Sequence, residues 1–395
     1  MRRGRAPSVR LVGCAILRCV TTGLDGDVLR RLRDAGPQTK SQLAEWLGVP
    51  RTTLTTSLQS LAASGHIEDG PLAPSSGGRR SVTVRTTSDR VVVALSLGER
   101  RVRIAVLDGH LAIESGVSID LQDRGTDPDP ITATVRRATE QVLAGRVPVA
   151  FGIAAAGSAP LTPEDLADFL EEDYPGTPVA TIPAVRAMAL GEHRSGEARG
   201  IDDFVAVRLG DTVTVATMAG GHLSAGGSGR AGEIGHLRVE EFGPACVCGL
   251  TGCLDSFVSS VALVAQATDL AQRGRSGTLA NVLARSGALD LADLVAAGRA
   301  GDPAVAQLAR ELGQRLGGVL ATLVAQGDPL RVVIGGPVAA LGAHVLGDLR
   351  TTVYRLAPAR LAENLDIVLS ELGDHAVLIG AGSTAWEAWI AALGR

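Results

Sequence analysis

The segment that decides the fold reads Ala231-Gly-Glu-Ile-Gly-His236, followed after nine intervening residues by Cys246-Val-Cys248-Gly-Leu-Thr-Gly-Cys253-Leu-Asp255. One imidazole and three thiols in so short a segment form the closed donor set of a structural, tetrahedral zinc site, whereas a catalytic zinc needs an open position. Glycines within the segment let the backbone wrap a small cation. We therefore predict a structural zinc ion held by His236, Cys246, Cys248 and Cys253. The alternative is a set of buried cysteines without a metal.

The same residues carry a resemblance to a known family. The run Gly232-Glu-x-Gly-His236, with Cys-x-Cys-Gly-x-x-Gly-Cys and a following acidic residue, is similar to the signature of the ROK family of repressors and sugar kinases. The similarity is dense in this segment and extends more loosely from about Val91 to the C-terminus. It implies an α/β chain whose body has the two-lobed actin-like ATPase (RNase H-like) fold.

Composition limits the class of protein. The chain has 395 residues, of which 45% are apolar and 20% charged, as in soluble globular proteins of two or three domains. No apolar run reaches the roughly 18 residues of a membrane span. Two of the five cysteines, Cys14 and Cys19, lie outside the metal segment, so no disulfide framework is indicated and we expect a cytoplasmic protein. A signal peptide at the Arg-rich start is the alternative, but Arg18 interrupts its apolar stretch.

Charge is distributed unevenly along the chain. Residues 1–86 carry 13 Lys or Arg against 6 Asp or Glu, a formal charge of +7, and the remaining residues carry 25 against 36, a charge of −11. A basic head on an acidic body favours contact between the head and a polyanion. A solvated basic face without a partner is the alternative.

The head has the pattern of a winged helix-turn-helix. A first helix around Leu29 and Leu32, with Asp27 as its N-cap, stops at Gly36-Pro37, and a second spans residues 39–47. A third helix over residues 50–64 turns Leu54, Leu58 and Leu61 toward the other two. Two strands follow, at Ile67 and at residues 81–85, joined by a Gly-Gly-Arg-Arg wing. A plain three-helix interaction module is the alternative.

The exposed face of the third helix favours DNA reading. Small hydroxyl-bearing residues with an arginine at the N-terminal end can reach base edges and phosphates in a major groove, and two wing arginines can reach phosphates or a minor groove. The segment from Arg51 to Ser57 is then the reader. The expected DNA contacts are Thr39, Ser41, Arg51, Thr52, Thr53, Thr55, Thr56, Gln59, Arg79 and Arg80.

The resemblance also identifies positions where sugar kinases carry catalytic residues, and this chain departs from them. The Asp-x-Gly-Gly-Thr phosphate loop aligns with residues 96–100, where Ser96 replaces the aspartate. The Glu-Asn-Asp motif, whose aspartate is the general base, falls on Ile182, Pro183 and Ala184, and a methyl group cannot accept a proton. The second Gly-rich loop is replaced by Gly210-Asp-Thr-Val-Thr-Val-Ala216. We therefore expect no phosphotransfer.

The sugar-contacting positions of the family are partly retained. Glu233, His236 and Asp255 stand at positions that reach sugar hydroxyls in the family, and Gly157 ends a small-residue turn resembling the family's ligand-proximal one. A metal-bound imidazole orients its remaining N–H toward a second partner, so His236 would couple metal and ligand. The alternative is that Glu233 only supports the metal loop and that Gly157 only ends a strand.

These expectations combine into one interpretation. Residues 1–24 form an N-terminal extension for which disorder and order are both left open. Residues 25–86 form the DNA-binding head, 90–198 the first lobe, 199–375 the second lobe with its zinc loop at 236–253, and 376–395 a helix returning to the first lobe. We expect a zinc-containing transcriptional repressor, a homodimer or higher homo-oligomer on a palindromic double-stranded operator, with a non-catalytic body that senses a sugar or sugar derivative. The alternatives are an active sugar kinase with a DNA-binding head, and a regulator controlled by a protein partner.

Overall fold

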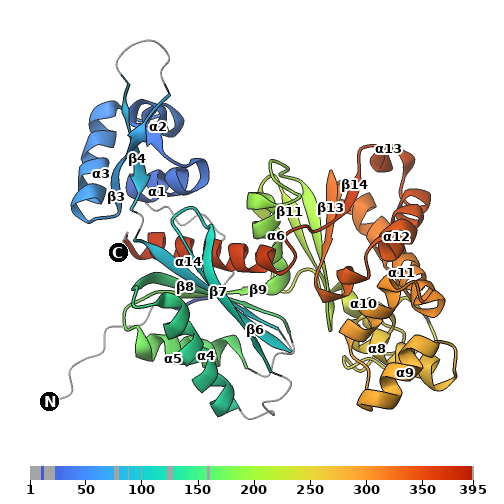
Figure 1. Ribbon diagram of the computed structural model, residues 1–395. Helices are drawn as coiled ribbons and strands as arrows, with labels where there is room; N and C mark the ends of the chain where they lie inside the picture. The colour runs from blue at the N-terminus through green and yellow to red at the C-terminus, as the bar shows by residue number, and fades with distance from the viewer. Residues whose placement is uncertain are drawn as a thin grey trace. The chain divides into compact units, whose positions relative to one another are not determined.

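The protein is described by a computed structural model (Figure 1) that covers residues 10–12, 23–74, 80–87, 89–98, 100–121, 128–157 and 161–393. The chain forms two compact units, one made of Met1–Ala187 with Leu378–Arg395 and the other of Met188–Val377. It passes from one unit to the other twice. Both crossings lie inside helices, α6 (Ala184–Ser195) and α14 (Asp374–Leu393).

The first unit begins with a winged helix-turn-helix head, as the sequence predicts. Its apolar core comes from the inward faces of three helices, where Leu29, Leu32, Leu43, Leu54 and Leu61 are almost fully buried. A small sheet in the order β2-β4-β3 closes the head. Its elements are α1 (Leu24–Ala35), β2 (Gln38–Thr39), α2 (Lys40–Leu47), α3 (Arg51–Ala63), β3 (Ile67–Leu72) and β4 (Val82–Thr86).

Two local details of the head differ from the sequence interpretation. Asp27 is not an N-cap, because α1 begins three residues earlier at Leu24 and Asp27 lies in its first turn. The end of the reader segment was also wrong, since Ser57 is buried and its hydroxyl donates to the carboxylate of Asp25 on α1. Thr39 does cap α2, through a capping box with Gln42.

A six-stranded sheet in the order β1-β9-β8-β5-β6-β7 forms the rest of the first unit. Helices α4 and α5 pack on one of its faces, and α14 covers the other so closely that a side chain at Gly152 would overlap the backbone of Ala381. Strand β1, at Arg10–Val12, adds an edge strand parallel to β9 that the sequence did not indicate. The elements are β1, β5 (Val91–Leu97), β6 (Arg101–Leu107), β7 (Ile113–Asp120), α4 (Pro128–Leu143), β8 (Pro148–Ala155), α5 (Pro163–Asp173) and β9 (Val179–Pro183).

Helix α14 is long and apolar enough, by composition alone, to cross a membrane. In the structure, however, 78% of its most apolar stretch is buried, with Trp386 fully enclosed. Burial against a sheet explains the same composition without a membrane, because a helix that is apolar on all sides is also typical of a protein core.

The second unit is built on a five-stranded sheet in the order β12-β11-β10-β13-β14. Its apolar core lies between this sheet and a layer of helices dominated by α11 and α12. The elements are β10 (Phe204–Leu209), β11 (Val213–Ala219), β12 (His222–Leu223), η1 (Ile234–His236), α7 (Asp255–Val258), α8 (Ser260–Gln272), α9 (Gly277–Ser286), α10 (Leu291–Arg299), α11 (Pro303–Gly327), β13 (Arg331–Gly335), η2 (Pro337–Leu341), α12 (Ala343–Leu356), α13 (Ala359–Ala362) and β14 (Asp366–Leu369).

Candidate metal loop and nucleic-acid interface

The histidine and the three cysteines singled out in the sequence converge in the second unit. His236 ends the short helix η1, and the cysteines lie on the loop between η1 and α7. One donor atom each of His236, Cys246 and Cys248 lies within 4.8 Å of the others, and all three cysteines are free thiols. Cys253 lies beside this group of three, with its Sγ 3.7 Å from that of Cys248.

The separations suit a tetrahedral cation. With metal–sulfur bonds of about 2.3 Å and a metal–nitrogen bond of about 2.0 Å, two thiolates at the corners of a tetrahedron lie roughly 3.8 Å apart and an imidazole nitrogen roughly 3.5 Å from a thiolate. The structure has 3.7 Å between Cys248 and Cys253 and 3.5 Å between the Nδ1 atom of His236 and the Sγ atom of Cys246. The donor set therefore fits a zinc-sized ion.

The thiols differ in their electrostatic surroundings. A hydrogen bond from the backbone at Leu250 lowers the pKa of Cys248, which is exposed. Burial raises the pKa of the Cys253 thiol to about 12, and neighbouring thiols add to that shift. A bound cation binds thiolates, so it would displace these protons and offset the charge that burial disfavours.

Two glycines of the signature are required by close packing. Gly232 has a φ of +105°, and a Cβ there would overlap the carbonyl oxygen of Val215 on β11. A Cβ at Gly235 would overlap the carboxylate of Asp255. The Asp255 carboxylate in turn accepts a hydrogen bond of 2.8 Å from the Val213 amide and lies 3.8 Å from Nδ1 of His236. The loop is therefore packed directly onto strand β11.

Three of the expected ligand residues, Glu233, His236 and Asp255, lie in the second unit. His236 and Asp255 are adjacent, and Glu233, which precedes η1, is exposed. Burial raises the pKa of Asp255, although the Val213 amide and His236 oppose the shift. Gly157 belongs to the other compact unit. Sequence reasoning missed Val213, whose backbone amide carries no residue-type signal.

The structure describes the residues that the resemblance aligns with the catalytic groups of sugar kinases. Ala184 is the first residue of α6 and is buried directly after β9. Ser96 lies near the end of β5, and Gly98 makes a tight turn in which its amide donates to the carbonyl of Arg101. The turn after β10 is held by the Ser260 amide, which donates to the carbonyl of Gly210 over 2.9 Å.

The outward face of α3 presents most of the residues expected to read DNA. Arg51, Thr52, Thr53, Thr55, Thr56 and Gln59 are all exposed. The Arg51 guanidinium donates to the Ser41 hydroxyl across 3.1 Å, so the two helices of the motif join at this point. The hydroxyls of Thr55 and Thr56 donate to carbonyls one turn earlier, which leaves their oxygen lone pairs and methyl groups facing outward.

The wing is only partly described. Strands β3 and β4 pair antiparallel, and Arg80, just before β4, is exposed. Arg79 and the rest of the tip lie outside the described residues. Thr39, at the start of α2, is half-buried because its side chain serves the capping box.

The fold and these sites define a class of protein, a winged helix-turn-helix head joined to an actin-like sugar-kinase body with a cysteine–histidine loop. A family model described as the ROK family matches residues 133–387. The chain therefore belongs to the ROK family, which confirms the resemblance found in the sequence.

Individual relatives include both regulators and kinases. The DNA-binding transcriptional dual regulator NagC of Escherichia coli K12 is 24% identical over 90% of each chain. A glucokinase of Halalkalibacterium halodurans is 28% identical over 75% of this chain and 94% of its own length. Among solved structures, a ROK family transcriptional regulator described as a homolog of the E. coli MLC protein superposes with a TM-score of 0.76 at 21% identity, covering 94% of this chain and 96% of its own. A Streptomyces griseus glucokinase superposes with a TM-score of 0.65 at 27% identity, covering 75% and 99%.

Proposed function

We propose that this protein is a transcriptional regulator, acting as a repressor, that binds a double-stranded DNA operator through its winged helix-turn-helix head. The observation that carries the proposal is the exposed face of α3, with an arginine at its N-terminal end and a row of threonines and a glutamine behind it. The basic charge of the head supports it, because a phosphate backbone attracts such a surface. The relatives support it too, since the regulators align over at least 90% of the chain and the glucokinases over 75%.

The chemistry of the α3 face favours direct reading of bases. The outward oxygens of Thr55 and Thr56 can accept hydrogen bonds from base amino groups, and their methyl groups can contact thymine. Arg51 and Gln59 reach farther from the helix, so they can contact base edges or phosphates. Ser41, Thr52 and Thr53 surround them, and the wing arginines Arg79 and Arg80 would add phosphate contacts.

We further propose that the body is not a kinase. The buried Ala184 at the position aligned with the general base supports this, because a methyl group cannot take the proton from a sugar hydroxyl. The turn at Gly210 also accepts a backbone hydrogen bond from Ser260. The kinases among the relatives keep the active-kinase alternative open to test. Turnover of ATP with a hexose would overturn this part of the proposal.

In this proposal the cysteine–histidine loop holds a structural zinc ion. The close group of His236, Cys246 and Cys248, with Cys253 beside Cys248, supports this, because four protein donors would close the coordination shell. The metal would then stabilise the loop and supply no chemistry. His236 would bind through Nδ1 and direct its other ring nitrogen elsewhere. Together with Glu233 and Asp255 of the same unit, it is our candidate for contacts to a sugar-derived effector.

A homodimer on a two-fold operator completes the proposal, because two recognition helices about one DNA turn apart match such a site. To weaken operator binding about a hundredfold, an effector would need about 2.7 kcal/mol of differential affinity for the two states. A regulator that is controlled by a protein partner would bind the same DNA, but sugars would not change that binding.

The experiment that tests the proposal is fluorescence anisotropy of the purified protein on DNA from upstream of its own gene, with and without a panel of sugars and sugar phosphates. Tight, salt-sensitive binding released by one sugar is the expected result. Absence of binding to this DNA and to a randomised operator library would overturn it. A parallel ATP-dependent phosphorylation assay on hexoses and N-acetylhexosamines tests the kinase alternative.

A further inference from the structure

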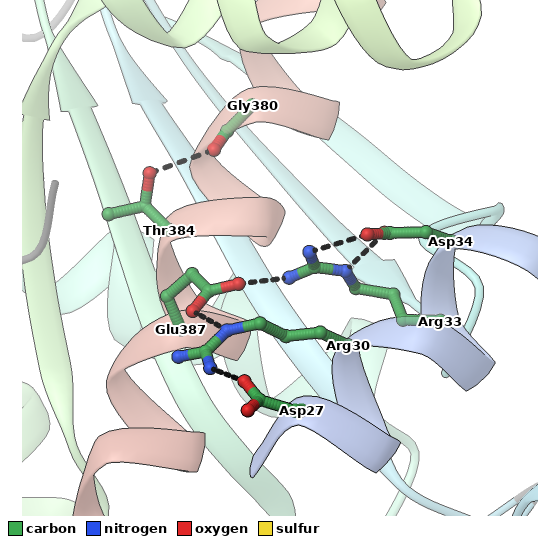
Figure 2. Close-up of polar contacts among 7 residues, drawn as sticks. All are labelled: Asp27, Arg30, Arg33, Asp34, Gly380, Thr384 and Glu387. Atoms are coloured by element: carbon green, nitrogen blue, oxygen red, sulfur yellow. Dashed lines mark hydrogen bonds and ion pairs between the residues drawn. The ribbon is translucent and has the colours of Figure 1, made fainter. Parts of the chain in front are cut away.

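Helix α14 carries one charged residue in an otherwise uncharged stretch. Between residues 376 and 393 the only ionisable side chain is Glu387, in a helix that is mostly buried. Both of its carboxylate oxygens accept hydrogen bonds from arginine side chains. One accepts a hydrogen bond of 2.9 Å from Nε of Arg30 and the other a hydrogen bond of 2.7 Å from a terminal nitrogen of Arg33 (Figure 2).

The two arginines belong to α1, the helix of the head that packs beneath α3. Figure 2 shows Glu387 of α14 between them, so the last helix of the chain holds the first helix of the head. Arg33 is 8% exposed and Glu387 22%, so solvent screens this pair less than a surface ion pair. The ion pair between Arg33 and Glu387 can therefore help to orient the head.

Each arginine has a second carboxylate within α1 itself. Arg30 also donates to Asp27 across 2.9 Å, and Arg33 donates to Asp34 across 2.7 and 3.2 Å (Figure 2). If Glu387 withdrew, both guanidiniums would keep a partner of opposite charge. Release would then avoid the large cost of leaving a buried charge without compensation. The contact is built so that it can open without unfolding the head.

The reading face of the head stays exposed while the contact is made. α1 lies on the inner side of α3, where Ser57 bonds to Asp25, and the reading residues lie on the outer side. Just after α3, the guanidinium of Arg90 donates to the carbonyl of Gly65. The Glu387 contact therefore fixes the direction in which α3 points and does not cover it.

α14 begins in the second unit and ends in the first. In the first unit a side chain at Gly380 would overlap the carbonyl of Ala187 on α6, and in the second unit a side chain at Gly191 would overlap that of Ala376. The two helices that join the units thus touch backbone to backbone on both sides of the boundary. Thr384, one turn before Glu387, bonds back to the Gly380 carbonyl at 2.9 Å (Figure 2).

We propose that Glu387 is a positioning residue for DNA binding. It holds the head on α14 through Arg30 and Arg33, fixes the orientation of the recognition helix, and frees the head when α14 shifts. The inference rests on the proposed DNA-binding function and adds the residue through which the body controls the head.

The test uses Glu387→Gln in the full-length, zinc-loaded protein, with Glu363→Gln on the exposed end of α13 as the control of equal charge change. Hydrogen–deuterium exchange of residues 24–35 and 86–90 reports the mobility of the head without any DNA. Anisotropy on the wild-type operator, and on operators with one or two base pairs inserted between half-sites, reports positioning.

We expect faster exchange in both segments, a roughly fivefold weaker operator affinity, and a smaller penalty for the altered spacing, because a mobile head loses preorganisation but tolerates displacement. A loss of stability alone would lower affinity without changing the spacing preference. Arg30→Gln leaves Arg33 and Glu387 paired, so it should change exchange, affinity and spacing preference in the same direction but by less. It replaces Glu387→Gln in the test if that variant does not fold.

The two possible failures are distinguishable. Unchanged exchange in Glu387→Gln would overturn the positioning role whatever the DNA results. A wild-type protein that binds no operator, with exchange still accelerated by Glu387→Gln, would overturn the proposed DNA-binding function while supporting the contact between α14 and the head.

Discussion

The carboxylate of Asp255 accepts a hydrogen bond from the backbone amide of Val213 across 2.8 Å, although the two residues are 42 positions apart. This bond ties the helix that follows the cysteine loop to the first residue of β11. A second link lies beside it, where the hydroxyl of Ser260 donates to the carboxylate of Asp211 in the preceding turn. The cysteine loop and the turn after β10 are therefore one packed structure, and a change in one should be detectable in the other.

Removal of a metal ligand should destabilise the second unit. In Cys248→Ser the expected result is loss of the bound zinc and a melting temperature lower by several degrees, because structural zinc contributes directly to folding. Metal analysis and differential scanning calorimetry measure the two effects. Cys14→Ser, which changes a cysteine outside the loop, is the control. A variant with full metal content and unchanged melting would refute the ligand assignment.

Because Gly235 packs against Asp255, adding one methyl group at this position should lower the stability of the second unit. Gly235→Ala should cost about 2–3 kcal/mol in the free energy of unfolding, because the added Cβ forces the carboxylate away from the Val213 amide. Gly227→Ala is a matched control, since a Cβ at Gly227 would meet no atom within 4 Å. Denaturant unfolding measures both. Equal stabilities would show that the Asp255 contact is not needed.

Restoring the general base alone should not restore catalysis. In Ala184→Asp we expect no detectable hexose phosphorylation. By the resemblance to the kinases, Ser96 stands where they have an aspartate that helps to hold magnesium, and the turn at Gly210 stays bonded to Ser260. General-base catalysis is worth about 10²- to 10⁴-fold only where a bound nucleotide is present to react. A coupled assay for ADP measures the outcome, and clear turnover would mean that ATP binds despite these replacements.

The wing arginines should bind phosphates of the operator. Replacement of Arg79 and Arg80 by alanine is expected to weaken operator binding and to reduce the slope of log affinity against log salt by about 0.9 for each phosphate that the wing no longer neutralises. Arg299→Ala, at the exposed end of α10 in the second unit, removes a positive charge far along the chain from the head. Affinity titrations at several salt concentrations distinguish the two. An unchanged slope in the wing variant would exclude the wing as a phosphate-binding element.

The parts of this fold that the sequence predicts are those encoded by nearby residues. The metal donors lie within one loop, and the three helices of the head show their buried faces through the spacing of leucines such as Leu54, Leu58 and Leu61. Contacts between distant segments leave no such pattern. Arg30 and Glu387 are 357 positions apart, and the only sequence signal of their contact is a lone carboxylate in an apolar helix.

The contact between His66 and Trp389 predicts a pH dependence in the attachment of the head. The imidazole of His66, just before β3, meets the Trp389 ring of α14 edge-on with the ring centres 5.1 Å apart. Burial lowers the pKa of His66 below its ordinary value, the charge of Arg90 lowers it further, and the carboxylate of Asp25 partly opposes them. Within the described residues, its Nδ1 atom has no hydrogen-bond partner.

A histidine whose pKa is lower in the folded state binds fewer protons there than in the unfolded chain. Its neutral form therefore favours the docked head at pH 7, and this contribution is lost as the pH falls through the ordinary histidine value of about 6.5. We expect hydrogen exchange in residues 24–35 to accelerate below about pH 6, after correction for the intrinsic pH dependence of exchange. In His66→Phe, which keeps an aromatic ring against Trp389 but cannot take up a proton, this additional acceleration should disappear, whereas His222→Phe at an exposed position should behave as wild type. An identical pH profile in His66→Phe and wild type would mean that other groups control the attachment of the head at low pH.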